Sequence, residues 1–149
     1  MDELDRTILS ELSEDASISI PKLSEKIKVN PSVVYSRIKR LTNKKLIERF
    51  TIVVNDKELG YGVKALTGIN MDTKFRDTII DELFKIKGVR EISEVTGRFD
   101  IIVTMYAMNL AEMHKLISEG IGSIQGVLAS ESFIEMKRRT KTMPYNHEA

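Results

Sequence analysis

The chain contains no cysteine, which excludes disulfides, thiolate zinc sites and cysteine nucleophiles and is compatible with a reducing cytosol. Long apolar runs are also missing, because stretches such as Ile101–Val103 are far too short to span a bilayer. The acidic start, Met-Asp-Glu-Leu-Asp, does not resemble a secretory signal. We therefore expect a cytoplasmic protein without a membrane partner.

Histidine is scarce as well. His114 and His147 are the only two, and neither has an acid–histidine neighbourhood with metal-ligand spacing. The methionines Met71, Met105, Met113 and Met136 are predicted to fill a core or an interface rather than a cofactor site. The sequence thus predicts no metal, no cofactor and no catalytic residue.

Positive charge is concentrated in one segment, although the formal net charge of the chain is only +1. Between Lys22 and Arg49 nine basic residues stand against two acidic ones, a net charge of +7, whereas residues 51–149 carry 13 basic and 14 acidic residues. Such a local cationic patch suits a polyanion. The alternative is a solvated, lysine-rich helical surface, and charge alone leaves both open.

Three short helices are predicted in the first fifty residues. Ser19 and Asn30 are suitable N-caps for the second and third helix, each followed by a proline that the first turn tolerates. A short turn between two helices, of which the second carries a polar and basic face, is typical of a helix-turn-helix. Apolar residues at helical spacing mark the buried side of the three helices: Leu4, Ile8, Leu9 and Leu12; Leu23 and Ile27; Val34, Ile38 and Leu41.

The rest of the chain alternates between strand and helix patterns. A strand at Phe50–Val54 leads out of the first domain, and a linker with two glycines follows. The later elements have the order β-α-β-β-α-β of a ferredoxin-like α+β domain. We divide the chain into a helix-turn-helix domain (1–50), a strand and linker (51–63) and a ferredoxin-like domain (64–149). The expected elements of the last part are strands at 65–71, 89–96, 100–107 and 127–136, one helix with Phe75, Ile79, Ile80, Leu83 and Phe84 inward, and one capped by Asn109 with Leu110, Met113 and Ile117 inward.

Five local patterns, in this order and spacing, resemble the Lrp/AsnC (feast/famine) family of transcriptional regulators. They are the opening Leu4–Leu9, the helix Asn30–Leu41, the pair Leu46–Ile47, the turn Thr96–Asp100 with Gly-x-x-Asp, and the closing stretch Gly126–Ser132. The resemblance covers nearly the whole chain and implies the two-domain architecture expected above.

Three residues depart from the family's pattern. Lys28 and Lys45 occupy places after a helix where the family often has glycine. If their backbones are left-handed, each lysine costs on the order of 1 kcal/mol relative to glycine. Arg98 stands where the family commonly has an acidic residue, which bears on the identity of an effector rather than on the fold.

The third helix supplies the candidate DNA-reading residues. In a helix-turn-helix the N-terminal part of this helix meets base edges, while neighbouring cations hold phosphates. Arg37 is the candidate for bidentate reading of guanine and Val33 for contact with a thymine methyl. Arg37 could instead pair with an acid on the first helix, and Tyr35 could serve packing or a phosphate. The full set comprises Ser32, Val33, Ser36 and Arg37 at the groove, Lys22, Lys39, Arg40 and Lys44 at phosphates, and Tyr35.

The resemblance implies that the turn Gly97–Asp100 helps to enclose a small effector, often an amino acid, between paired C-terminal domains. As structure alone, Gly97 would supply a positive φ and Asp100 would accept local backbone hydrogen bonds. Arg98 could pair with an effector carboxylate or remain solvated. The candidate effector-binding residues are Gly97, Arg98, Phe99, Asp100, Ser130 and Ser132. The basic run at 137–139 is a solvated strand end or a second nucleic-acid contact.

The sequence therefore predicts a sequence-specific regulator, not an enzyme. Its partners would be double-stranded DNA, an amino-acid effector and further copies of itself, as a homodimer or a higher even-numbered oligomer. An effector-independent architectural DNA binder of the same fold is one alternative. A siroheme-decarboxylase-like enzyme on the same architecture is another, but it would need basic or histidine residues around a tetrapyrrole, and outside the tail the second domain has only His114.

Overall fold

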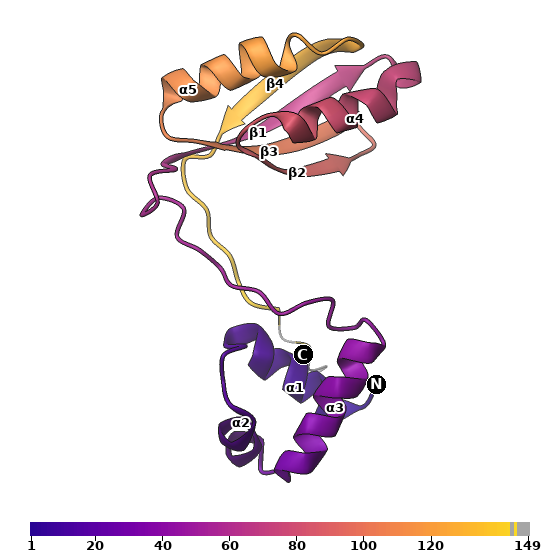
Figure 1. The fold of residues 1–149 in the computed structure, drawn as a ribbon, viewed down its shortest axis with the longest axis vertical. Coiled ribbons are helices and arrows are strands. Elements are labelled where there is room, and N and C mark those ends of the chain that lie inside the picture. The colour runs from indigo at the N-terminus through magenta and orange to yellow at the C-terminus, as the bar shows by residue number, and fades with distance from the viewer. Residues whose placement is uncertain (144, 146–149) are drawn as a thin grey trace. The chain divides into compact units, whose positions relative to one another are not determined.

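The computed structural model describes residues 1–143 and 145, so the expectation for His147 lies outside the described residues. Two compact units make up the chain (Figure 1). The helical unit comprises Met1–Val53 together with the described residues 139–143 and 145, and the sheet unit comprises Val54–Arg138. The sequence predicts that residues 64–149 form a single domain. In the structure the chain leaves the helical unit after Val53 and returns to it at Arg139, so it passes between the two units twice.

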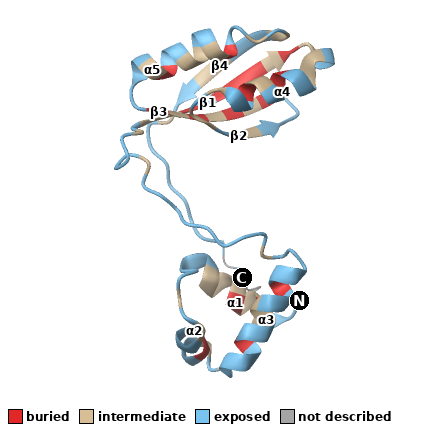
Figure 2. Cartoon of the chain, in the orientation of Figure 1, coloured by how far each residue is buried: buried red, intermediate tan, exposed pale blue. Residues whose placement is uncertain are grey.

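The helical unit contains the three expected helices: α1 (Glu3–Glu14), α2 (Ile20–Ile27) and α3 (Pro31–Asn43). Ser19 and Asn30 cap α2 and α3 as predicted, since their side chains accept hydrogen bonds from backbone N–H groups of the first turn. The carboxylate of Asp2, which the sequence analysis had not identified as a cap, does the same for α1. The buried residues Ile8, Leu23, Val34 and Leu41 form the core (Figure 2).

Two lysines end helices in the left-handed backbone conformation. Lys28 after α2 and Lys45 after α3 each have a φ of 57°. Both ends are closed by backbone hydrogen bonds back into the last helical turn, from Val29 N–H to the Ser24 carbonyl and from Leu46 N–H to the Leu41 carbonyl. Because both lysines have a left-handed backbone, each carries the steric cost that glycine would avoid.

The sheet unit has the predicted β-α-β-β-α-β order. The elements are β1 (Val63–Met71), α4 (Arg76–Lys85), β2 (Val89–Glu94), β3 (Ile101–Ala107), α5 (Leu110–Lys115) and β4 (Val127–Ile134). The four strands form one antiparallel sheet in the order β2-β3-β1-β4. A short 3₁₀ turn (Thr73–Phe75) precedes α4, and a π-helical turn (Leu116–Ile121) follows α5.

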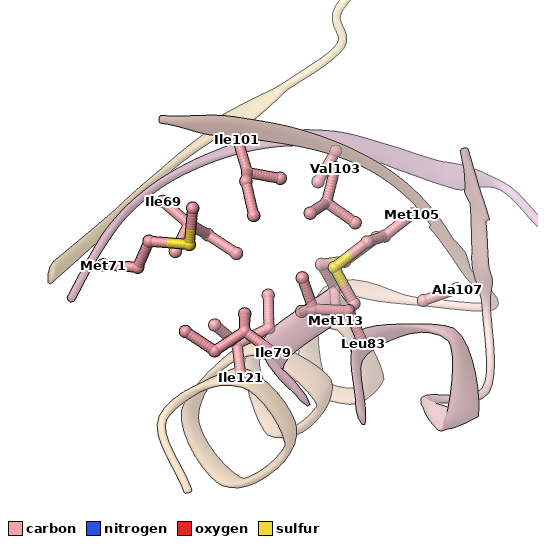
Figure 3. Packing of buried hydrophobic residues seen from close by; sticks show 11 residues of the cluster. Ile69, Met71, Ile79, Leu83, Ile101, Val103, Met105, Ala107, Met113 and Ile121 are labelled. Atoms are coloured by element: carbon pink, nitrogen blue, oxygen red, sulfur yellow. The ribbon is translucent and has the colours of Figure 1, made fainter. Parts of the chain in front are cut away.

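Both helices cover one face of the sheet, and the core lies between the layers (Figure 3). Alternate residues of β3 are buried against Ile79 and Leu83 of α4 and Met113 of α5. The expectation that Phe84 and Leu110 point inward is wrong, because both are exposed. Phe84 follows the buried Leu83 and so lies about 100° further round the helix, while Leu110 opens α5 at its N-terminal end.

The strand expected at Phe50–Val54 is not formed. Ile52 and Val53 are 80% and 100% exposed, and no backbone hydrogen bond joins this segment to any other described residue. A strand needs a neighbour to satisfy its backbone groups, and the described part of this single chain provides none. The β-branched composition that favoured a strand therefore leaves an exposed apolar segment.

The described end of the chain is tied to α1 within the helical unit. Arg6 donates a hydrogen bond from Nη1 to the carbonyl oxygen of Tyr145 at 3.3 Å, and the N–H of Tyr145 donates to Ser10 Oγ at 2.9 Å. The second passage of the chain between the units therefore ends on the first helix.

Candidate nucleic-acid interface and effector turn

The start of α3 presents small polar and apolar side chains to solvent. Ser32, Val33, Tyr35 and Ser36 are all exposed. The backbone N–H and the hydroxyl of Ser32 both donate to Asn30 Oδ1, at 2.9 and 2.8 Å, so the cap also fixes this side chain. The hydroxyl oxygen of Ser32 can still accept a hydrogen bond. The structure thus gathers the predicted base-reading residues other than Arg37 on an open helix surface.

Arg37 is engaged within the chain. Its Nη1 lies 2.5 Å from Asp2 Oδ2 and 3.2 Å from Asp5 Oδ1, which is the pairing with an acid of the first helix that the sequence analysis left open. The hydrogen bond from Arg37 lowers the pKa of Asp2 to about 2, and the same bond raises the pKa of Arg37. In the free chain the guanidinium therefore has two carboxylate partners on one nitrogen.

Asp5 is the buried centre of this ion-pair network. Its side chain is fully buried, and Arg40 Nη2 donates to both carboxylate oxygens at 2.8 and 2.6 Å. Burial alone would raise the pKa of Asp5, but hydrogen bonds from the Asp2 backbone and from Arg37 outweigh it and lower that pKa. Asp2 and Asp5 also form a reciprocal capping box. The network docks α3 onto the start of α1.

Three lysines of the cationic patch, unlike Arg37 and Arg40, form no ion pair with a described residue. Lys22, Lys39 and Lys44 are exposed, and no described carboxylate forms an ion pair with any of them. Lys26, by contrast, pairs with Glu11 on α1. These three lysines are thus accessible to the phosphates of a polyanion.

The effector turn, Gly97–Asp100, is anchored by its last residue. Asp100 Oδ2 accepts the backbone N–H of Met71 at 3.0 Å, and the backbone N–H of Asp100 donates to the Ile69 carbonyl at 3.0 Å. Gly97 has a φ of +144° and open space where a Cβ would stand. The positive φ expected of Gly97 is therefore present, whereas the side chain of Asp100 accepts its hydrogen bond from β1 and not, as expected, from its own turn.

Two partners of the effector turn, Gly68 and Glu131, were missed by sequence reasoning. The ring of Phe99 lies against Gly68 of β1, so close that a Cβ on Gly68 would be 2.4 Å from Phe99 Cδ2. Arg98 Nη2 lies 3.2 Å from Glu131 Oε2 on β4, and its guanidinium lies over the Phe99 ring, 5.5 Å from the centroid. Neither partner carries a local signal, because both meet the turn only through the pairing of β1 with β3 and β4.

The two serines of β4 have different surroundings. Ser132 Oγ lies 2.8 Å from the hydroxyl of the buried Thr67, so the two share a hydrogen bond. Ser130 is exposed and lies opposite Ile69 in the sheet register. Gly97 and Arg98 are exposed as well. The turn is therefore open to solvent in the single chain.

Other kinds of site find no support in the described residues. No three histidine or acidic side chains among them gather as metal ligands, and His114 is exposed on α5. No described helix is long and apolar enough to cross a membrane.

Comparison with known proteins identifies both halves of the chain. Residues 1–42 match the model of the AsnC-type helix-turn-helix domain, and residues 64–145 match that of the Lrp/AsnC ligand binding domain. The transcriptional regulator AzlB of Bacillus subtilis is 33% identical over 97% of this chain and 95% of its own length. A further regulator from Pyrococcus furiosus, FL11, is 29% identical over 95% of this chain and 93% of its own.

Solved structures agree over nearly the full length. AsnC of Escherichia coli superposes with a TM-score of 0.88 at 23% identity, covering 97% of this chain and 98% of that one. A transcriptional regulator of Neisseria meningitidis, solved as a complex with L-Met, gives a TM-score of 0.92 at 20% identity, covering 99% and 98%. An AsnC-family protein of Pyrococcus furiosus gives 0.82 at 30% identity, covering 93% and 92%.

Proposed function

The chain belongs to the Lrp/AsnC family of transcriptional regulators, and from that premise we propose that it reads specific DNA sequences as a homodimer or larger even-numbered assembly, under the control of an amino-acid effector. Its two parts are a DNA-binding helix-turn-helix and a domain that binds a small ligand. The finer claims concern which residues read DNA, which residues meet the effector, and how copies associate. We therefore place the protein in the cytoplasm, where it would meet DNA.

The DNA-reading part of the proposal rests on one observation, the exposed and rigidly capped start of α3. Ser32, Val33 and Ser36 would face base edges in the major groove, with Arg37 pairing to a guanine. A bidentate pair of that kind contributes roughly 1–3 kcal/mol of discrimination. Phosphates would be held by Lys22, Lys39, Arg40 and Lys44, with Tyr35 as a further backbone contact, and these contacts would make binding salt-dependent.

The effector part rests on the charges at the effector turn. Arg98 and Glu131 form an exposed pair of opposite sign, which is complementary to the carboxylate and ammonium groups of a free amino acid. Gly97, Phe99, Asp100, Ser130 and Ser132 would complete the site. Because the turn is open in the single chain, a second copy of the sheet unit would have to close it, which supports binding at an interface between copies. The Neisseria meningitidis regulator solved with L-Met is a precedent for an amino-acid ligand in this fold.

An effector-independent architectural DNA binder remains the second candidate, since the unpaired lysines beside α3 would serve it equally well. It predicts little preference among DNA sequences and no stabilisation by any amino acid. The enzymatic alternative is not carried further, because the relatives are named transcriptional regulators.

The test is binding of the purified protein to the DNA upstream of its own gene and to random DNA of equal length, at two salt concentrations. We expect tight, salt-sensitive binding with a clear preference for the upstream fragment, followed by a change in affinity when amino acids are titrated in. Equal binding to both fragments would favour the architectural candidate. No binding to either at low salt would contradict DNA binding altogether.

A further inference from the structure

Arg37 uses only one of its nitrogens within the chain. Both hydrogen bonds to the carboxylates of Asp2 and Asp5 leave from Nη1. Among the described residues, neither Nη2 nor Nε of Arg37 has a partner. These two nitrogens form one edge of the planar guanidinium, and such an edge matches two neighbouring acceptors in one plane. The free edge is therefore intact for a partner outside the chain.

The two carboxylates hold Arg37 in different ways. Asp5 is fully buried and already receives both bonds from Arg40, so its more distant contact with Arg37, at 3.2 Å, is a by-product of helix docking. Asp2 is about half exposed, lies only 2.5 Å from Nη1, and is itself fixed as the N-cap of α1. Asp2 is thus the residue that sets the direction of the Arg37 side chain at the surface.

The Asp2 carboxylate remains charged under physiological conditions, since the hydrogen bond from Arg37 lowers its pKa to about 2. A permanent negative charge beside α3 repels phosphates that approach from any DNA sequence. The same charge acts more weakly on a base edge, because bases carry no net charge. Asp2 therefore weakens sequence-independent contacts and leaves the pairing of Arg37 with a base in place.

We propose that Asp2 is a specificity-determining positioning residue, which grips Nη1 of Arg37 so that Nη2 and Nε are presented as a fixed pair of donors to the N7 and O6 acceptors of one guanine in each half-site. This inference rests on the proposed function, in which α3 reads the major groove. It adds a residue outside the helix-turn-helix surface, the N-cap of the first helix, that contacts no DNA and acts through Arg37.

The test replaces Asp2 by asparagine, which removes the charge and keeps an N-cap side chain. Affinities are measured for a preferred DNA site and for a set of sites in which each base pair is changed in turn. We expect D2N to bind random DNA more tightly and to lose discrimination at one base position per half-site, by about three- to tenfold, a part of the effect of a whole bidentate pair. The other positions should keep their preferences.

Glu3→Gln is the matched control, because it removes the same charge from the neighbouring residue, which makes no contact with Arg37. It should shift all affinities alike. In a background with Arg37→Gln, D2N should no longer change any base preference, since the two residues act as one unit. If D2N fails to fold, Asp2→Ser, which is also neutral and can also cap the helix, is tested in the same way. Thermal unfolding shows whether each variant is folded.

Unchanged preferences at every position in D2N or D2S would overturn the inference while leaving the proposed function standing. The same would follow if D2N altered preferences equally with and without Arg37. A wild-type protein that prefers no site over random DNA would instead contradict the proposed function, and the inference with it.

Discussion

Arg40 donates from a single nitrogen, Nη2, to both carboxylate oxygens of Asp5, and Asp5 is fully buried between α1 and α3. A buried carboxylate depends on its partners, because without them its charge would lie in a poorly solvated position. This pair therefore contributes to the position of the DNA-reading helix as well as to the stability of the helical unit.

Replacing Asp5 by alanine should lower the free energy of unfolding by roughly 2–3 kcal/mol, because the hydrogen bond from the Asp2 backbone N–H to Asp5 Oδ2 and both arginine contacts are lost together. Chemical denaturation of the full chain measures the change. Glu3→Ala, two residues away and exposed, should change stability by much less. Equal losses in the two variants would show that the buried network is not a main source of stability.

Glycine at either left-handed lysine should stabilise the protein. Lys28→Gly and Lys45→Gly should each raise the free energy of unfolding by up to about 1 kcal/mol, since glycine adopts a positive φ without steric cost. The adjacent Lys44 has a φ of −79°, so Lys44→Gly should give no such gain. A gain from Lys44→Gly equal to the other two would contradict the backbone explanation.

Gly68 should not tolerate a larger residue while Phe99 lies against it. Gly68→Ala should destabilise the sheet unit by about 1–3 kcal/mol through overpacking, and the added change Phe99→Leu should recover part of this loss. Gly62→Ala, where the nearest atom would be 3.8 Å from the new Cβ, is the matched control and should be close to neutral. The absence of any rescue by Phe99→Leu would place the strain elsewhere.

Arg37 and Lys39 should affect DNA binding differently. Arg37→Ala should relax base preference at one position in each half-site, because a base contact is lost. Lys39→Ala should weaken binding to all sequences about equally and reduce its salt dependence, because a phosphate contact is lost. If both variants lowered specific and random binding by the same factor, the assignment of Arg37 to base reading would be wrong.

Ionisation of Asp2 should make the free energy of unfolding depend on pH in the acidic range. Its pKa is about 2 in the folded chain, against 3.8 as the ordinary value. The contribution of Asp2 is therefore fully present above pH about 4 and is lost as the pH falls through about 2, where the folded chain also takes up the proton. Asp2→Asn should lose less stability than the wild type between pH 5 and 2 in urea denaturation. Identical losses in the two proteins would contradict the lowered pKa.

Local signals in the sequence predicted most of the fold. Ser19 and Asn30 were recognised as caps because a cap needs only its own side chain and the following turn. The order of strands and helices followed from periodicity in the same way. The prediction of a strand at Phe50–Val54 was wrong for the single chain, since strand formation depends on a neighbouring strand and not only on the residues of the segment itself.

The candidate sites were less accessible to such reasoning. The exposed start of α3 follows from helical spacing, but the choice between a free Arg37 and one paired with the first helix depends on the angle at which two helices pack. Gly68 and Glu131 meet the effector turn only through the sheet register. One sequence does not encode that register in any local pattern, so neither residue could be assigned to the turn in advance.

The chain passes twice between the helical unit and the sheet unit, and this determines how the two units can be prepared separately. Topologically the sheet unit is an insertion, since it is entered after Val53 and left before Arg139. A fragment of residues 54–138 would keep its own core, whereas a fragment cut at residue 53 would forfeit the bonds that Tyr145 forms with Arg6 and Ser10. A faithful DNA-binding fragment would therefore join residues 1–53 to the segment beginning at 139 through a short artificial bridge.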